Sequence, residues 1–250
     1  MFLLDRTPDP HAAALIARMT VPPSDNRADL INRTIRQLKD AHLFHKMDCL
    51  FVLAAHNAQA ALLDWKGGTY TATETNSPTF TVDRGYTFNG SSSYLDTTYN
   101  PTSAAGQYAL NSSHIAAFNL TNSQDAGACV GTTNGGMGFI TPRTATNTFV
   151  CRLNAGANDS VASVTNGTGH LLASRTSSTA FNAYRYGSSI GSFSRTSTSI
   201  PNGTFSIGRA TTSYGAHQIA AAHWGAGLSA DDAARVSKII SNYMSELGAI

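Results

Sequence analysis

The stretch that decides the fold is residues 69–97, which read TYTATETNSPTFTVDRGYTFNGSSSYLDT. Short runs rich in Thr, Tyr, Phe and Val occupy residues 69–75, 79–82, 86–88 and 94–97, and turn-forming residues separate them. β-Branched and aromatic residues favour strands, whereas Asn, Asp, Ser, Pro and Gly favour turns. Many short strands with frequent turns indicate a β-sandwich rather than alternating strands and helices.

The same texture continues to residue 207. Further runs of this kind lie at residues 114–118, 138–140, 148–153, 161–164, 170–174, 181–186 and 204–207. Asn-Gly pairs punctuate the strand-rich region, at residues 89–90, 134–135, 166–167 and 202–203. Because both residues of such a pair tolerate positive φ, each pair predicts a tight hairpin.

The N-terminal part has a helical pattern. Asp9 and Pro10 supply an N-cap carboxylate and a proline for the first helical position, so a helix is predicted over residues 11–19. Apolar residues at helical spacing predict a second helix over residues 26–41 and a third over residues 47–62, which two glycines follow.

A further helix is expected to close the chain. Ser229 and Asp232 resemble a capping box, and an apolar stripe follows at three-and-four spacing. We therefore divide the chain into an N-terminal docking arm (1–23), a helical lead-in (24–68) and a β domain that this helix closes (69–250).

The composition limits the classes of function. Of the 250 residues, 42% are hydrophobic, enough for a sizeable core, but only 13% are charged. The net charge is +2, and the arginines between Gly67 and Ser237, where no lysine occurs, are scattered. We therefore expect no nucleic-acid partner. The longest apolar run, residues 49–55, is too short to span a bilayer, so no membrane insertion is expected.

The cysteines and the N-terminus bear on the compartment. Cys49, Cys129 and Cys151 show no metal-ligand spacing and are predicted to be free, mostly buried thiols, with a bridge between the last two left open. Asp5 and Arg6 interrupt the first apolar residues, so we expect synthesis in a cytoplasm without a signal peptide.

Four pieces of the chain carry a resemblance. They are YTFNGSSSYLD at residues 86–96, AYRYGSSIG at 183–191, PNGTFSIGR at 201–209, and IAAAHW at 219–224 followed by Leu-Ser-Ala. Their order and spacing resemble the concanavalin/laminin-G-like jelly rolls. The resemblance implies a mainly β protein, an antiparallel jelly-roll β-sandwich with an α-helical N-terminal segment and a C-terminal helix.

The lead-in carries a second resemblance. Residues 30–65, which include MDCLFVLAAHNAQAALLDW at 47–65, resemble a segment found ahead of such domains in tailed-phage and prophage proteins. This implies a structural component of the virion, in the tail, fibre, collar or head decoration. The implied partners are other virion proteins and sister subunits of a homo-oligomer, and a host-surface glycan is left open.

Catalytic residues are not expected. The acids between residues 69 and 227 are Glu74, Asp83, Asp96, Asp125 and Asp159, and no two are close in sequence, whereas glycoside hydrolysis needs two facing carboxylates. The G-x-S-x-G pattern at residues 187–191 lacks the helix that must follow a nucleophile elbow, so a hairpin turn is predicted there. We therefore expect no enzyme, and a glycan-degrading enzyme is the distant alternative.

Ligand sites are less defined. Asp96, Asn100 and Asp159 are candidate Ca²⁺ ligands, since laminin-G-like domains often hold this ion, but turn capping is the commoner role of such residues, and we expect no cofactor. Exposed aromatic rings stack on sugars, and the candidates are Tyr99, Tyr184, Tyr186 and Tyr214. They support a second hypothesis, a carbohydrate-binding module or adhesin.

Overall fold

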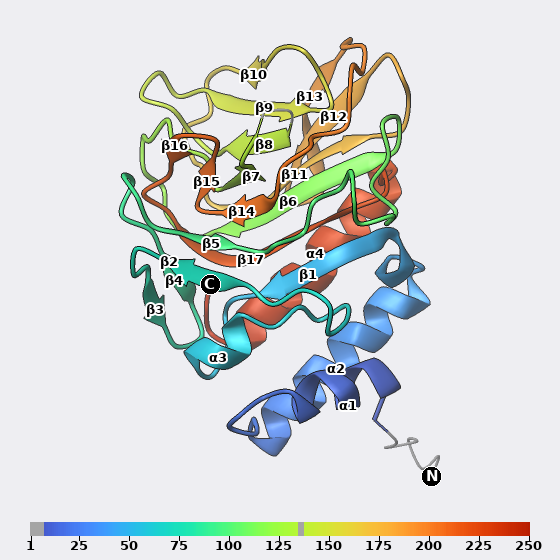
Figure 1. The fold of residues 1–250 in the computed structure, drawn as a ribbon, viewed down its shortest axis with the longest axis vertical. Coiled ribbons are helices and arrows are strands. Elements are labelled where there is room, and N and C mark those ends of the chain that lie inside the picture. The colour runs from blue at the N-terminus through green and yellow to red at the C-terminus, as the bar shows by residue number, and fades with distance from the viewer. Residues whose placement is uncertain (1–7, 135–137) are drawn as a thin grey trace.

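The computed structural model describes residues 8–134 and 138–250. Two antiparallel β-sheets pack face to face, and helices cover the outer side of one of them (Figure 1). This confirms the predicted antiparallel β-sandwich with helices at both ends. None of the helices in the described ranges has the length and hydropathy needed to cross a bilayer.

The larger sheet has eight strands in the order β13-β12-β11-β6-β17-β4-β3, with β1 beside β17. Its central strand β17 pairs with β6 on one edge, and on the other edge with β4 at its start and β1 along the rest. The strands are β1 (Met47–Val52), β3 (Thr79–Thr81), β4 (Gly85–Thr87), β6 (Ser113–Asn119), β11 (Gly169–Arg175), β12 (Phe181–Arg185), β13 (Ser188–Phe193) and β17 (Gln218–Gly225).

The smaller sheet has seven strands in the order β10-β9-β8-β7-β14-β5-β2, and a short hairpin, β15–β16, follows β14. The strands are β2 (Thr73–Thr75), β5 (Tyr94–Asp96), β7 (Val130–Thr132), β8 (Gly138–Thr141), β9 (Phe149–Leu153), β10 (Asp159–Val161), β14 (Phe205–Ile207), β15 (Arg209–Ala210) and β16 (Ser213–Tyr214).

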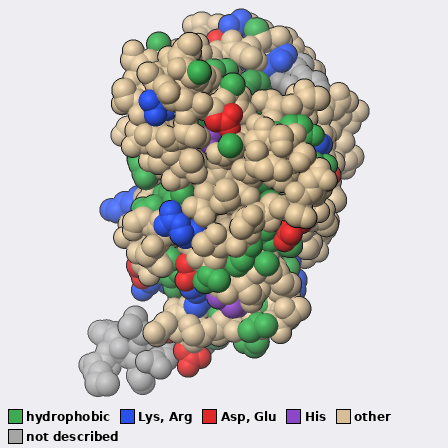
Figure 2. Space-filling view, turned by 90° about the vertical axis from the view of Figure 1, so that its left-hand side faces the viewer, with side chains coloured by type: hydrophobic (Ala, Val, Ile, Leu, Met, Phe, Trp, Pro, Cys, Tyr) green, Lys and Arg blue, Asp and Glu red, His purple; other side chains and the backbone are tan. Residues whose placement is uncertain are grey.

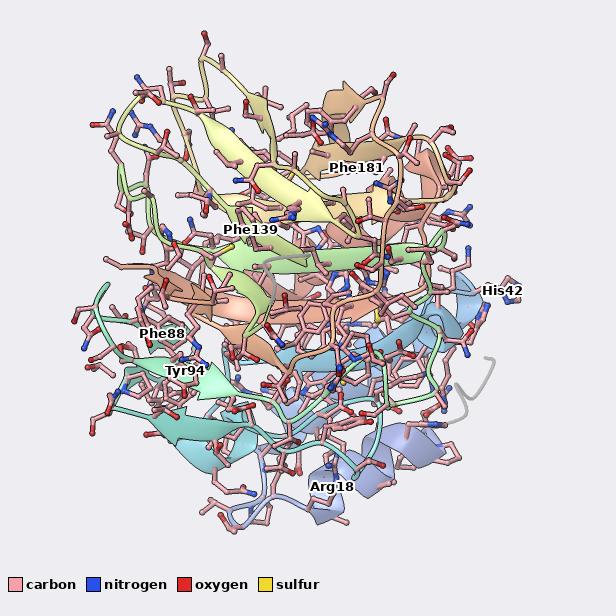
Figure 3. The ribbon with its side chains drawn as sticks, turned by 45° about the horizontal axis from the view of Figure 1, so that its top comes forward. Arg18, His42, Phe88, Tyr94, Phe139 and Phe181 are labelled. Carbon is pink, nitrogen blue, oxygen red and sulfur yellow. The ribbon has the colours of Figure 1, made fainter. Side chains whose placement is uncertain are left out.

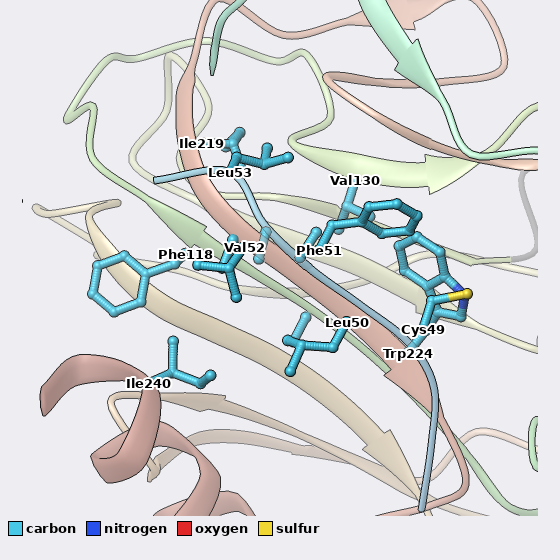
Figure 4. Packing of buried hydrophobic residues seen from close by; sticks show 14 of the residues in the cluster. Cys49, Leu50, Phe51, Val52, Leu53, Phe118, Val130, Ile219, Trp224 and Ile240 are labelled. Atoms are coloured by element: carbon cyan, nitrogen blue, oxygen red, sulfur yellow. The ribbon is translucent and has the colours of Figure 1, made fainter. Parts of the chain in front are cut away.

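Aromatic rings join the two sheets. Trp224 of β17 stacks on Phe205 of β14 with ring centroids 4.7 Å apart, and Phe51 and Tyr99 lie against the same indole. Figure 4 shows Trp224 and Phe51 in this layer. Cys49, Cys129 and Cys151 are buried free thiols, as predicted.

The helices form successive layers outside the larger sheet. The long helix α4 (Ala230–Glu246) begins at the predicted capping box of Ser229 and Asp232 and lies against the sheet (Figure 1). The helix α2 (Asp25–Asp40) packs on α4, and α1 (Pro10–Ala17) packs on α2. Two short turns, η1 (Phe44–Lys46) and α3 (Ala58–Ala61), flank β1.

Three buried histidines lie between the larger sheet and α4. Nε2 of His114 is 2.9 Å from Nδ1 of His223, whose Nε2 is 2.9 Å from Nε2 of His170. The row ends on the carbonyl oxygen of Ala226 at one side and on the hydroxyl of Ser237 in α4 at the other. If every ring is neutral, each histidine can donate from one ring nitrogen and accept at the other. The Ser237 hydroxyl then donates into the row and the Ala226 carbonyl oxygen accepts at its other end, so the row is fully hydrogen-bonded without charge.

The third predicted helix is wrong over its first part, because residues 47–52 form strand β1. Leu50 and Val52 point toward Ile240 of α4, whereas Cys49 and Phe51 point toward Trp224 (Figure 4). A strand that is covered on both faces is apolar throughout, and such a run does not distinguish strand from helix by periodicity. One strand of the predicted lead-in therefore belongs to the larger sheet, while the three-part division stays a prediction.

The Asn-Gly pairs also differ from expectation. Residues 89–90, 166–167 and 202–203 each lie between strands of different sheets, so they are not hairpin turns, and Gly135 lies outside the described residues. The Asn89 side chain explains the first case, because its Oδ1 accepts three successive backbone N–H groups and stabilises a wider loop. A tight two-residue hairpin is formed instead by Tyr186-Gly187, with φ of 49° and 77°, which confirms the hairpin turn predicted at the G-x-S-x-G pattern.

Candidate functional site

The outer face of the smaller sheet carries a row of exposed side chains that the strand register sets. In β9, Phe149, Cys151 and Leu153 are buried in the core, so Val150 and Arg152 point outward. Phe139 of β8 pairs directly with Arg152 and therefore shares the outer face with it. The neighbouring position on β7 is Gly131, which has no side chain.

The β15–β16 hairpin forms a wall across this face. It lies so close to β7 that a Cβ at Gly131 would come within 2.5 Å of Cβ of Ala210 and 2.6 Å of Cβ of Phe139. Ala210 pairs with Ser213, and Arg209 pairs with Tyr214, so the two pairs lie on opposite sides of the hairpin. Ala210 and Ser213 face Phe139, and Arg209 and Tyr214 face the other way.

Between this wall and β9 is an open hollow of about 330 Å³. Phe139 (labelled in Figure 3) and Val150 give it an apolar floor, and Arg152 supplies a positive charge. The remaining lining residues are small or carry hydroxyl or amide groups: Ala126, Thr141, Thr144, Asn158, Ala210, Thr211 and Ser213. Among the described residues that line the hollow, none is Asp or Glu. An apolar floor bordered by hydroxyl and amide groups suits a ligand that combines C–H faces with hydroxyls, such as a sugar.

Arg152 is held in place by the loop after β9. Its Nε donates a hydrogen bond of 2.6 Å to the carbonyl oxygen of Ala155. Burial lowers the pKa of Arg152, but a guanidinium remains charged at any physiological pH. The hollow therefore contains a fixed positive charge beside an aromatic ring.

The opposite side of the hairpin is occupied by a cation–π stack. The Arg209 guanidinium lies 3.7 Å from the centroid of the Tyr94 ring and 5.7 Å from that of Tyr214. Its Nη1 also donates to the Tyr214 hydroxyl at 3.2 Å. The sequence-predicted candidate Tyr214 is thus near the hollow but on the far side of the wall, where its ring contacts the protein.

The other tyrosine candidates lie elsewhere. Tyr99 and Tyr184 are 1% and 4% exposed, so the prediction that their rings stack on a ligand is wrong. Tyr99 is a core residue whose hydroxyl donates to Asp48, and burial together with this carboxylate raises its pKa. Tyr186 is 44% exposed, but it packs edge-on against Phe118 of the larger sheet.

The calcium candidates are not brought together. Asp96 and Asn100 each accept a backbone N–H two residues ahead, which is turn capping, and Asp159 binds Arg195 through both oxygens. Four strands separate β5, which carries Asp96, from β10, which carries Asp159. Among residues 8–134 and 138–250 no group of three His, Cys, Asp or Glu side chains is placed to hold a metal ion.

The acids of the β domain have structural partners. Glu74 accepts from the Tyr86 hydroxyl, Asp83 pairs with Arg27, and Asp125 accepts from the backbone of Gly127 and Ala216. Glu74 and Asp96 are on adjacent strands, but Thr73 is the direct partner of Asp96, so the two carboxylates point to opposite faces.

Ser123, His217 and Asp125 form a Ser-His-Asp grouping that the sequence reasoning did not find. His217 is fully buried, with Nδ1 3.4 Å from the Ser123 hydroxyl and Nε2 3.1 Å from the Gly127 carbonyl oxygen and 3.7 Å from Asp125. Its closest contact is thus to a backbone carbonyl, and none of the three residues lines the hollow. The grouping fixes the loop before β7.

Sequence reasoning also missed Phe139 and Arg152 as site residues. The alternation of buried and outward residues in FVCRL, residues 149–153, is the signal that points Arg152 outward. Basic side chains elsewhere are scattered singly on the face shown in Figure 2, so a basic patch does not mark another site there.

Neither a protein-family model nor a curated protein matches the sequence. Solved structures do match. A Trypanosoma rangeli sialidase is 11% identical with a TM-score of 0.57, over 87% of this chain and 39% of its own. The binding domain of Paraclostridial mosquitocidal protein 1 is 10% identical with a TM-score of 0.55, over 80% of this chain and 53% of its own. A botulinum neurotoxin type C structure is 13% identical with a TM-score of 0.53, over 80% of this chain and 51% of its own.

At these identities the likeness concerns the fold alone. This chain spans about half of the toxin chains and less than half of the sialidase chain. The neighbours include an enzyme and toxin binding domains.

Proposed function

We propose that this chain is a non-enzymatic glycan-binding module that is carried on a phage particle. The observation on which the proposal rests is the hollow beside Phe139: an aromatic floor, a rim of hydroxyl and amide groups, and no carboxylate among the described lining residues. Aromatic rings bordered by hydroxyl and amide groups suit sugar binding, whereas most glycosidases use two carboxylates at the site for catalysis.

The comparisons support the binding half of the proposal. Cell entry of botulinum neurotoxin type C, one of the structural neighbours, depends on interaction with two ganglioside molecules. That toxin, which shares the fold over about half of its chain, therefore interacts with a glycolipid. Because sialidases are also among the structural neighbours, a glycan-degrading enzyme is the alternative function.

The contacts of the acids support the absence of catalysis. Canonical glycosidases place two carboxyl groups on either side of the scissile bond. Here Asp159, the acid adjacent in sequence to the lining residue Asn158, is neutralised by Arg195. Glu74 contacts a tyrosine that is fully buried in the core.

The phage setting rests on the resemblance of residues 30–65 and on the arrangement of the layers. In Figure 1 the helices α1 and α2 lie at one end of the long axis, and β8, β9 and β10 lie at the other. The helical end can therefore contact other virion proteins or sister subunits while the hollow faces a host-surface glycan. Mass spectrometry of purified phage particles tests this half: the chain is expected among the virion proteins, and its absence would contradict the setting.

Glycan arrays test the binding half. We expect the full chain to bind a subset of bacterial surface glycans and Phe139→Ala to lose at least tenfold in affinity. Val82→Ala is the control, because it truncates an exposed apolar side chain that does not line the hollow. Equal binding by the wild type and Phe139→Ala would place the site elsewhere, and release of sugar from the glycan would revive the enzyme alternative.

A further inference from the structure

We infer that the hollow selects acidic glycans, in which a sugar carries a carboxylate or a sulfate group, and that Arg152 is the residue that determines this specificity. The inference rests on the proposed function and names the ligand class of the same site. It follows from where the strand register places Arg152, from the charges that surround the hollow, and from how the guanidinium is held.

The strand register places the Arg152 charge beside the Phe139 ring. Phe139 and Arg152 are direct partners in the β8–β9 ladder, and direct partners in an antiparallel pair have Cβ atoms roughly 4.5–5.5 Å apart on one face. A sugar ring that stacks on Phe139 therefore carries its substituents to within reach of the guanidinium. Thr141 and Val150 form the next pair along the same two strands, and both also line the hollow.

The charges around the hollow have one sign. Arg152 is the one charged residue among the described residues that line it. Asp159, which follows the lining residue Asn158, has Oδ2 2.9 Å from Nε and Oδ1 2.8 Å from Nη2 of Arg195. A neutral sugar leaves the Arg152 charge partly desolvated, whereas an oxyanion forms charge-assisted hydrogen bonds that are about twice as strong as neutral ones.

The guanidinium is oriented before a ligand arrives. Its Nε donates to the Ala155 carbonyl oxygen. Ala155 itself is buried and bridges to Ser197, so the acceptor is part of a fixed strand connection. A cation that the protein already holds in place loses little entropy on binding, and its charge favours a carboxylate or sulfate group over a neutral one.

The test uses matched pairs of glycans that differ only in charge. The probes are oligogalacturonate and its methyl ester, sialyllactose and lactose, and a sulfated galactan and its desulfated form, each titrated against the full chain by calorimetry. We expect at least a tenfold preference for the charged member of at least one pair. A preference confined to the first two pairs identifies a carboxylate, and one confined to the third identifies a sulfate.

The variants assign the preference to one residue. Arg152→Gln is expected to lose the preference while it binds the neutral member as the wild type does, and Arg152→Lys is expected to keep part of it. Arg235→Gln, at an exposed position of α4, removes the same charge away from the hollow and is expected to change nothing. Thermal melting of each variant shows that the fold is retained.

Two results would overturn the inference. Equal affinity for the charged and neutral members of every pair contradicts it, as does an Arg152→Gln variant that keeps the preference; in both cases the glycan-binding function itself stands. If no glycan binds, charged or neutral, the proposed function fails together with this inference.

Discussion

The two outer faces of the sandwich differ in what covers them. The outer face of the larger sheet is covered by α4, and its polar side chains are buried and hydrogen-bonded: the row of His114, His223 and His170 ends on Ser237 of the helix. None of the described helices covers the outer face of the smaller sheet, which carries the hollow with Phe139 and Arg152. Strands β6 and β11 of the covered sheet are buried on both faces, whereas β9 of the open sheet alternates between buried and partly exposed residues. The helical cover therefore separates the face that stabilises the fold from the face that can bind a ligand.

Acidification is expected to destabilise the contact between the larger sheet and α4, and this is the largest of the expected effects. Burial lowers the pKa of His114 to about 4 and that of His170 to about 3, and it lowers the pKa of His223 well below its usual value. In the unfolded chain each histidine titrates near pH 6.5, so the unfolded state binds more protons below that pH and stability falls as the pH falls.

Each histidine contributes at most about 1.4 kcal/mol per pH unit, so the free energy of unfolding is expected to fall by up to about 4 kcal/mol per unit between pH 6.5 and 4. Urea titrations at pH 7.5, 6.5, 5.5 and 4.5 measure it. A protonated ring also places two N–H groups against each other in the row, which weakens the contact of α4. A free energy of unfolding that is constant from pH 7 to 5 would contradict the neutral row.

Removing apolar contact from α4 is expected to have the next largest effect. Ile240 is 1% exposed and lies near Phe118 and Val52 (Figure 4). Ile240→Ala creates a cavity in this layer and should cost about 2–5 kcal/mol of stability in urea unfolding. Lys238→Ala, two residues away on the exposed face, is the control and should stay within about 0.5 kcal/mol.

The glycan affinity of the Ile240→Ala variant tests whether the two faces act independently. It is expected to match the wild type wherever the variant is folded, because α4 and the hollow lie on opposite sides of the sandwich. A parallel loss of stability and affinity at a temperature well below unfolding would show that the two faces are coupled.

A side chain at Gly131 should disturb the open face. In Gly131→Ala the added Cβ meets the Cβ atoms of Ala210 and Phe139, so the hairpin wall must shift. We expect a loss of about 1–3 kcal/mol of stability together with weaker glycan binding. Gly156→Ala is the control, since its Cβ would lie 3.7 Å from Thr198. Unchanged affinity in Gly131→Ala would show that the wall is not part of the site.

The sequence predicts the sandwich and its closing helix better than it predicts the site. Turn residues and β-branched runs are local signals, and the capping box at Ser229 is read from four residues. Strand β1 is missed because its residues are apolar on both sides, and only the position of α4 explains why. The alternation in residues 149–153 points Arg152 outward, but the hollow also needs the β15–β16 hairpin and Phe139 of another strand, which no local pattern brings together.

The smallest expected effect tests which side of the wall binds the ligand. Tyr94→Leu removes the ring that lies 3.7 Å from the Arg209 guanidinium, a half-exposed cation–π contact (Tyr94 is labelled in Figure 3). We expect a loss of about 0.5–1 kcal/mol in urea unfolding. Glycan affinity should change less than twofold, because Ala210 and Ser213 face the hollow while Arg209 faces away from it. If Tyr94→Leu instead loses as much affinity as Phe139→Ala, the stack of Tyr94, Arg209 and Tyr214 contacts the ligand and the glycan crosses the hairpin rather than ending at it.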